Sequence, residues 1–288
     1  AGIQYSYDTR FSVFSHDPDG TLVNADGVTV GKTGTKSMAD QMADGSLMSA
    51  DSSTFTSTRM SMLTGKTDQN AAPSSFHEIM PSADGKKNVG KVISDNYEVV
   101  EGSWPKNKNE VVLVLDENNS LSLTAVYELG LKSASEYHDM MNQLNSGDDV
   151  KTDTKKIDYS DVIDRTLKLL PACDQYVKGD NGHWTYVGDD VDQINALIDS
   201  DKAIDLKIVG VVKPVEDADA TPLSSGVGYT RALTNELIDR AESSEIVTEQ
   251  QADKDHNVLN GMTFSPSDDV TKAQDARDYV ASLGVSSK

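Results

Sequence analysis

The sequence contains a single cysteine, Cys173, so no disulfide can form within the chain. We expect this residue to be a small buried apolar side chain rather than a nucleophile. Long hydrophobic runs are also missing: the densest, Val111 to Leu115, falls far short of the about 18 residues that a membrane helix needs. There is no signal-peptide pattern, and the first residue is Ala1 rather than Met, which predicts an excised or processed piece of a longer protein.

Aromatic residues are scarce, at 6% of the chain, and apolar residues make up 37%. Both fractions are low for a globular protein, so we expect a modest core and generous loops. The 288 residues nevertheless suffice for a real core, in one large domain or two small ones.

Basic residues are few: 26 stand against 47 acidic ones, and the formal net charge is −21. Such a surface repels a phosphate backbone, which argues against nucleic acid as a partner. It also disfavours direct adhesion to anionic lipid headgroups. The charge favours solubility and is suited to cationic partners.

The first part of the chain reads as hairpins followed by a polar insertion. Strands are predicted within Ile3–Phe14 and at Leu22-Val23, separated by a turn at Asp17–Gly20. A further turn at Asp26-Gly27 leads to Val28 and Val30. Residues 31–75 are rich in Ser, Thr, Gly, Asp and Met, which predicts a weakly ordered insertion with a short helix near 37–42.

The rest of the chain mixes strands and helices. Strands are predicted at Tyr97–Val100, Glu110–Leu115, Val162–Leu170, His183–Val187 and Leu206–Val212, the first two joined by a turn at Trp104–Asn107. Helices are predicted at Thr124–Leu131, Ser133–Leu144, Asp189–Asp199 and Thr230–Ala241, with Thr124 and Ser133 as N-caps, and from Ser267 onward. The last helix has an apolar stripe of Val270, Ala273, Ala276, Val280 and Leu283.

Two segments resemble phosphate-binding loops but fail on spacing. Gly27–Thr33 has three residues between its glycines instead of four, and Gly65-Lys66-Thr67 has Met60 where the first glycine should stand. The loop needs its fixed spacing because backbone amides must point at the phosphates. We therefore predict no nucleotide site.

Three short signatures of penicillin-recognising serine enzymes occur: Ser103-Trp-Pro-Lys106, Ser94-Asp95-Asn96 and Lys32-Thr33-Gly34. Their order is the reverse of that in the enzymes. The first signature should begin a helix, and Pro105 in a turn between strands argues against one. A serine acyl-enzyme is thus a competing hypothesis that the sequence does not favour.

Metal motifs are also missing. Counted from Asp17, position 6 of a calcium loop is Leu22 and position 12 is Val28, where glycine and glutamate are required. No two histidines have metal-ligand spacing among the five, which are His16, His77, His138, His183 and His256. We therefore predict no catalytic residue, no metal ligand and no cofactor.

Several segments carry a resemblance to a known family. The strongest are Tyr97–Asn119, Leu206–Pro214 and Gly226–Leu233, with weaker support from Ile3–Asp8 and Phe76–Met80. Together they resemble the large extracellular domain of FtsX-like, MacB-type ABC transporter permeases of Gram-positive bacteria. The resemblance covers most of the chain from residue 76 onward.

The resemblance implies an α+β fold with two subdomains. A porter-like α/β part would be made from both chain ends, residues 1–94 and 216–288, with residues 31–75 as its insertion. A mostly-β part, similar to the Sabre domain, would be inserted at residues 95–215. Both chain ends would lie close together, facing the membrane.

The resemblance also implies a function in mechanical coupling. The domain would stand on the extracellular side of the cell membrane and relay ATP hydrolysis by a cytoplasmic ABC ATPase subunit, which it contacts through membrane helices outside this sequence. A homodimer of permeases and an extracellular substrate or partner are further implied associations. The family handles peptides, lipoproteins, antibiotics and cell-wall hydrolase activation, and no residue here selects among them.

A secreted or surface-anchored ligand-binding or adhesive module is the alternative hypothesis. It predicts a deep apolar pocket or an aromatic-lined groove. Trp104 and Trp184 are the only tryptophans, so a sugar-binding platform would be poorly supplied.

Overall fold

The computed structural model describes residues 7, 9–24, 75–121, 123–146, 158–188, 190–218 and 220–282. By its contacts the chain divides into two units. The first unit comprises residues 1–169 and 204–234, and the second comprises residues 170–203 and 235–288. Among the described residues, no helix combines the length and apolar character needed to cross a membrane.

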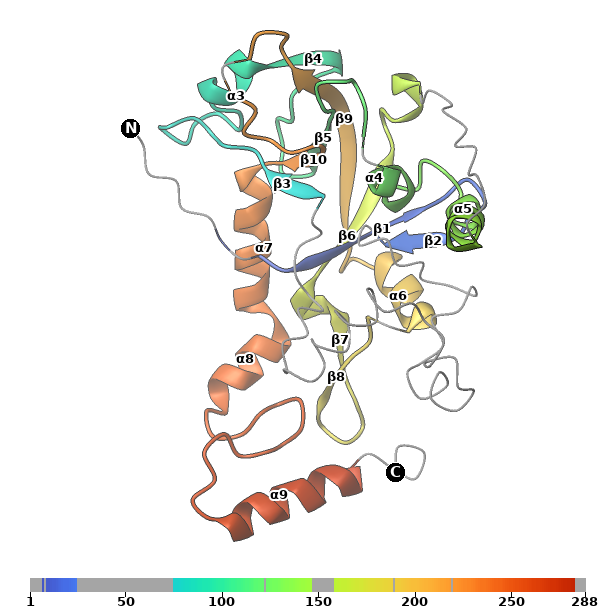
Figure 1. The fold of residues 1–288 in the computed structure, drawn as a ribbon. Helices are drawn as coiled ribbons and strands as arrows, with labels where there is room; N and C mark the ends of the chain where they lie inside the picture. Colours follow the sequence, from blue (N-terminus) through green and yellow to red (C-terminus); the bar gives the residue numbers. More distant parts are fainter. Residues whose placement is uncertain are drawn as a thin grey trace. The chain divides into compact units, whose positions relative to one another are not determined.

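The fold is mixed α and β, as predicted (Figure 1). The first unit contains β1 (Phe11–His16), β2 (Leu22–Asn24), β3 (Phe76–Glu78), α3 (Lys91–Asn96), β4 (Tyr97–Gly102), β5 (Glu110–Val114), α4 (Leu123–Glu128), α5 (Ala134–Ser146), the 3-10 helix η2 (Tyr159–Asp161), most of β6 (Thr166–Pro171), β9 (Ile204–Pro214), β10 (Gly226–Tyr229) and the first turn of α7 (Arg231–Ser243). The second unit contains the 3-10 helix η3 (Ala172–Gln175), β7 (Tyr176–Lys178), β8 (Trp184–Tyr186), α6 (Val191–Ile198), the rest of α7, α8 (Glu245–Ala252) and α9 (Asp269–Ser282).

The eight-stranded sheet has the order β2-β1-β6-β9-β5-β10-β3, and β4 also pairs with β9. The pairs β5/β9 and β10/β3 are parallel, whereas β9 is antiparallel to both β6 and β4. The most apolar runs of the sequence occupy its middle: every residue of Val111–Leu115 is at most 4% exposed. Strands buried on both faces need such continuous apolar runs.

The chain crosses over β9 between β4 and β5, which pair with opposite sides of that strand. The predicted turn at Trp104–Asn107 is therefore part of a crossover and not of a hairpin. Where the crossing begins, the Ser103 amide donates to the Val209 carbonyl oxygen over 2.9 Å. A β-carbon on Gly210 would overlap the Ser103 carbonyl oxygen, and one on Gly102, whose φ is 72°, would overlap that of Val209. Glycine at both positions lets the two backbones touch.

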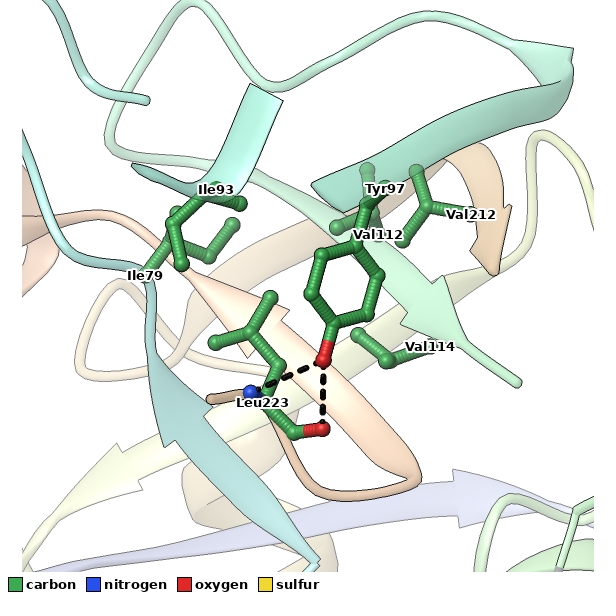
Figure 2. Close-up of a cluster of buried hydrophobic side chains, with 7 residues drawn as sticks. All are labelled: Ile79, Ile93, Tyr97, Val112, Val114, Val212 and Leu223. Atoms are coloured by element: carbon green, nitrogen blue, oxygen red, sulfur yellow. Dashed lines mark hydrogen bonds between the residues drawn. The ribbon is translucent and has the colours of Figure 1, made fainter. Parts of the chain in front are cut away.

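A buried cluster fills the side of the sheet next to α3 (Figure 2), and its members are Ile79, Ile93, Tyr97, Val112, Val114, Val212 and Leu223. Tyr97 is 2% exposed and brings a hydroxyl into this apolar surrounding. The hydroxyl donates to the Leu223 carbonyl oxygen over 2.9 Å and accepts from the Leu223 amide over 3.0 Å. One side chain thus satisfies both backbone groups of a buried loop residue.

Replacing Tyr97 by phenylalanine should lower the free energy of unfolding by about 1–3 kcal/mol. The change leaves the ring in place but removes the partner of two buried backbone groups of Leu223. Urea denaturation measures the loss. Tyr7→Phe is the matched control because Tyr7 is 55% exposed. Equal stability of the two variants would contradict the proposed role of the hydroxyl.

Of two predictions for a turn and a helix end, one is confirmed and one is wrong. The turn at Asp17–Gly20 is confirmed by a bond from the Gly20 amide to the Asp17 carbonyl oxygen of 2.9 Å and by a φ of 78° at Gly20. Thr124 is no N-cap, because α4 already begins at Leu123. Strands β3 and β7 and helices α3 and α8 were not predicted. Predictions for residues 25–74, including the polar insertion up to that point, lie outside the described residues.

Cys173 is half-buried rather than buried. Burial raises the pKa of its thiol, and the neighbouring Asp174 acts in the same direction. A raised thiol pKa disfavours the thiolate that a nucleophile needs. Partial exposure therefore does not make it a reactive cysteine.

Strands from both predicted subdomains lie in the first unit. Strand β5 falls in the predicted insert, residues 95–215, and β10 falls in the predicted porter-like part. The two strands pair in one sheet, with Leu113 opposite Val227. Strands of both predicted parts thus share the first unit, and the porter-like and Sabre-like partition stays a prediction.

Candidate functional site

A largely buried ion pair of the first unit lies where β3 ends and α7 begins. Arg231 Nε donates to Glu78 Oε1 over 2.6 Å, and Arg231 Nη2 lies 2.6 Å from the same oxygen. Thr234 Oγ1 donates to the other carboxylate oxygen, Oε2. The Glu78 side chain is 15% exposed and that of Arg231 is 21% exposed. We call these three residues, with Tyr229, the Glu78 network.

The network extends to the segment before β1. Tyr229 is 7% exposed, and the side chains of Thr9 and Thr234 interact with its hydroxyl and oppose the effect of burial on its pKa. Burial raises the pKa of Tyr229. The Arg231 guanidinium lies 5.5 Å from the centroid of the Tyr7 ring, within the range of a cation–π contact. Residues far apart in the sequence are thus held at the start of one helix.

The geometry of the Glu78 network suits positioning more than reaction chemistry. Both oxygens of Glu78 are engaged by donors of the chain itself, and its charge is balanced by Arg231. A general base needs an accessible oxygen directed at a substrate proton. A carboxylate near a helix N-terminus instead stabilises the helix through its dipole. We conclude that the network fixes the start of α7 to the end of β3.

The other end of α7 is fixed within the second unit. Arg240 Nε lies 2.9 Å from Asp174 Oδ2, and Arg240 Nη2 donates to the Asp201 carbonyl oxygen over 3.1 Å. Burial raises the pKa of Asp174, and the positive charge of Arg240 opposes that shift. The boundary between the units falls inside α7, between Thr234 and Asn235. The helix is therefore anchored by side chains on both sides of the boundary.

A second polar cluster joins the β1–β2 turn to α5. Asp17, only 5% exposed, accepts two amides of its own turn through Oδ1 and the Ala134 amide, 2.8 Å away, through Oδ2. Asp19 Oδ2 accepts from the hydroxyls of Ser133 and Ser135. Ser133 stands at the predicted N-cap position, yet its hydroxyl bonds Asp19. The cap of α5 comes from Asp17, more than a hundred residues earlier in the chain.

In the second unit, Trp184 is held by charged neighbours. Its Nε1 donates to Glu249 Oε2 over 2.9 Å, and Lys178 Nζ lies 2.9 and 2.8 Å from the two Glu249 oxygens. The hydrogen bond from Lys178 is the largest cause that lowers the pKa of Glu249. Trp184 is 7% exposed, and Trp104 packs partly buried against the core cluster. Neither indole forms an open sugar-binding platform.

The first two serine-enzyme signatures lie in different kinds of secondary structure. Ser94, Asp95 and Asn96 belong to α3, while Ser103 and Lys106 lie in the irregular crossover after β4. The helix that the first signature requires is missing there, which fits the expectation from Pro105. The third signature lies outside the described residues, as do both phosphate-loop candidates.

The histidines are scattered. His16 is exposed, and burial lowers the pKa of half-buried His77. His256 Nδ1 lies 3.1 Å from Asp253 Oδ2. Within the described ranges, no group of three or more His, Cys, Asp or Glu residues is arranged to hold a metal ion.

Comparison with models of protein families gave no match, and comparisons with curated proteins and with solved structures gave none either. The resemblance to transporter permeases thus rests on the quoted segments alone. No member of the Glu78 network was predicted as a site residue, although Glu78, Tyr229 and Arg231 lie in segments that carry the resemblance. The sequence offers only an acidic residue, Glu78, and a basic residue, Arg231, each near apolar residues, which is too common a pattern to single them out.

Proposed function

We propose that the chain is the extracytoplasmic domain of an ABC transporter permease and that it relays motion rather than catalysing a reaction. The observation that carries the proposal is α7. Glu78 holds its first turn in one unit, and Asp174 and Asp201 hold its later turns in the other. A continuous helix resists bending far better than a loop and is suited to transmit displacement.

The segments with the family resemblance give further support. They fold as β4, β5, β9 and β10, which pair with one another in one sheet. Short accidental matches would be expected to scatter over the fold. The position of the two chain ends, which the resemblance implies to be close, lies outside the described residues.

The partner prediction is tested on the full-length gene product in its own cells. We expect it in the membrane fraction, with this domain open to protease added outside and an ABC ATPase subunit in the same purified complex. Recovery in the medium or wall fraction without an ATPase would contradict the proposal and favour the adhesive-module alternative.

The coupling prediction is tested by inserting two glycines into α7 after Asn235. In the purified complex, spin labels at Glu117→Cys and Asp180→Cys, both exposed, with Cys173→Ser, report the distance between the two units. We expect ATP to shift this distance, and the insertion to reduce the shift by about half or more, because glycine weakens a helix interior.

Two glycines inserted after Gly85 provide the control, because that exposed turn lies outside the helix. An equal loss of the ATP-dependent shift in both insertion variants would contradict a relay through α7. An ATP-dependent shift in the distance that is unchanged by the insertion into α7 would also contradict such a relay. Circular dichroism of each variant establishes that the fold is retained.

A further inference from the structure

The two Asn-Gly pairs of the sequence, Asn181-Gly182 and Asn260-Gly261, both lie in the second unit. Asparagine followed by glycine is prone to spontaneous deamidation, because glycine lacks the β-carbon that would hinder attack by its own backbone nitrogen. That nitrogen attacks the asparagine side-chain amide and closes a five-membered ring. Both pairs offer the same reacting groups, so the structure decides which of them reacts.

The two pairs have the same local conformation. Each asparagine Oδ1 accepts the amide of the residue two positions on, over 3.1 Å at Asn181 and 2.9 Å at Asn260. Both glycines are left-handed, with a φ of 81° at Gly182 and 70° at Gly261. Negative charge develops on the asparagine oxygen during the attack, so the amide bonded to it stabilises that charge in both pairs. Local geometry therefore does not separate the two sites.

The surroundings of the two pairs differ. Asn181 and Gly182 are exposed in the turn between β7 and β8, and a β-carbon on Gly182 would meet no atom of the described residues within 4 Å. Asn260 and Gly261 are partly buried, and a β-carbon on Gly261 would lie 2.7 Å from Cε1 of the His183 ring. The reacting atoms must approach to about 3–3.5 Å, which requires the Asn-Gly peptide to turn. The exposed turn has room for this movement, whereas the packed one is held against the imidazole.

We infer that Asn181 is a site of self-modification, converted through a cyclic imide to aspartate and isoaspartate, and that the fold keeps Asn260 unreactive. The Gly182 nitrogen gives its proton to hydroxide and forms a bond to Asn181 Cγ. The bond between Cγ and Nδ2 then breaks, and this nitrogen takes a proton from water and leaves as ammonia. Water opens the ring at either of its two carbonyl carbons. The inference does not depend on the proposed function.

The modification alters a contact within the second unit. Isoaspartate adds a methylene group to the main chain and shortens the side chain that holds the His183 amide. The His183 ring packs against Gly261, and the Trp184 amide donates to the Val258 carbonyl oxygen over 3.0 Å. Both contacts join the start of β8 to the loop before α9, so we expect the isoaspartate form to weaken them.

Storage of the purified 288-residue chain in mildly alkaline buffer tests the inference, with peptide mapping by mass spectrometry as the readout. Deamidation exchanges an NH2 group for OH, and the increase in mass locates each modified asparagine. We expect Asn181 to react at least about tenfold faster than Asn260, because the packed pair must first open. Isoaspartyl methyltransferase with a labelled methyl donor should label the peptide that contains residue 181.

The denatured chain separates the effect of the fold from that of the sequence. In guanidinium chloride both pairs lose their surroundings, and we expect their rates to agree within about threefold. In the folded chain, Gly182→Ala should slow the reaction at Asn181 about tenfold, because the added methyl group hinders the attacking nitrogen. His183→Ala removes the ring that covers Gly261 and should speed the reaction at Asn260 about threefold.

Hydrogen exchange tests the structural consequence. The exchange rate of the Trp184 amide should rise about tenfold in the isoaspartate form. Asn181→Asp is the matched control, since it adds the same charge without the longer main chain and should leave this rate unchanged. An unchanged rate in the isoaspartate form would contradict a role of Asn181 in holding β8 to the loop before α9.

Three outcomes would overturn the inference. The first is an absence of reaction at Asn181 in the folded chain. The second is an equal or faster reaction at Asn260, since the packing of Gly261 against His183 would then give no protection. The third is the same preference for Asn181 in the denatured chain, because the sequence and not the fold would then select the site.

Discussion

Replacing Gly210 by alanine is expected to lower the free energy of unfolding by about 3–5 kcal/mol, among the largest effects of a single substitution. The added methyl group would overlap the Ser103 carbonyl oxygen and lie 3.0 Å from the Ser103 nitrogen. Both are backbone atoms in the crossing over β9, so no side-chain rotation relieves the contact. In the variant the strands would have to separate at the point where the strand paired with β9 changes from β6 to β4.

Gly85→Ala is the control for this prediction. Gly85 has a φ of 69°, but a β-carbon there meets no atom within 4 Å. Its substitution should cost only about 1–2 kcal/mol, the strain of a left-handed backbone. Urea denaturation followed by tryptophan fluorescence measures both variants. If Gly210→Ala were no more damaging than Gly85→Ala, the chain would not cross β9 in direct backbone contact.

Elements with strong local signals were predictable from the sequence. Strands β5 and β9 are long apolar runs, and β9 ends near Pro214 as expected. Helix α6 begins after Asp190, whose Oδ1 accepts from the amides of Asp192 and Gln193. In each case the residues that define the element lie within a few positions of it, so a short window of sequence suffices.

Relations between distant segments were not predictable in the same way. The pairing of β10 with β3 is set by two runs of three or four residues, separated by more than a hundred positions. The crossover after β4 reads locally as a turn between neighbouring strands. Periodicity predicts an apolar stripe on α9, but its described members Val270, Ala273 and Ala276 are exposed, and the partly buried side chains described on this helix are Thr271, Asp275 and Tyr279.

The Glu78 network is a similar case. Its ion pair joins residues 153 positions apart, and its tyrosine comes from a strand of four residues. No motif or spacing marks such a group, because its members are brought together by the sheet. The order β5-β10-β3 places Tyr229 and Glu78 side by side at the start of α7.

Replacing Glu78 by alanine is expected to destabilise the first unit by about 2–4 kcal/mol. The substitution leaves the Arg231 guanidinium, 21% exposed, without its carboxylate and removes the acceptor of the Thr234 hydroxyl. The residual exposure of both partners lets water reach the guanidinium, so we expect less than the full effect of a fully buried pair. The start of α7 should loosen first, and hydrogen exchange of the Arg231–Thr234 amides should rise together with the loss of stability in urea.

A double-mutant cycle separates the pair from the packing around it. Glu78→Leu alone leaves Arg231 uncompensated and Arg231→Met alone leaves Glu78 uncompensated, whereas the variant with both substitutions removes both charges and keeps apolar volume. Because the two side chains are only 21% and 15% exposed, the double variant should be more stable than either single variant. Lys168→Ala is a suitable reference, since its pair with Asp205 is largely exposed, and it should cost no more than about 1 kcal/mol. A Glu78→Ala effect as small as that of Lys168→Ala would mean that α7 is not fixed to β3 by this pair.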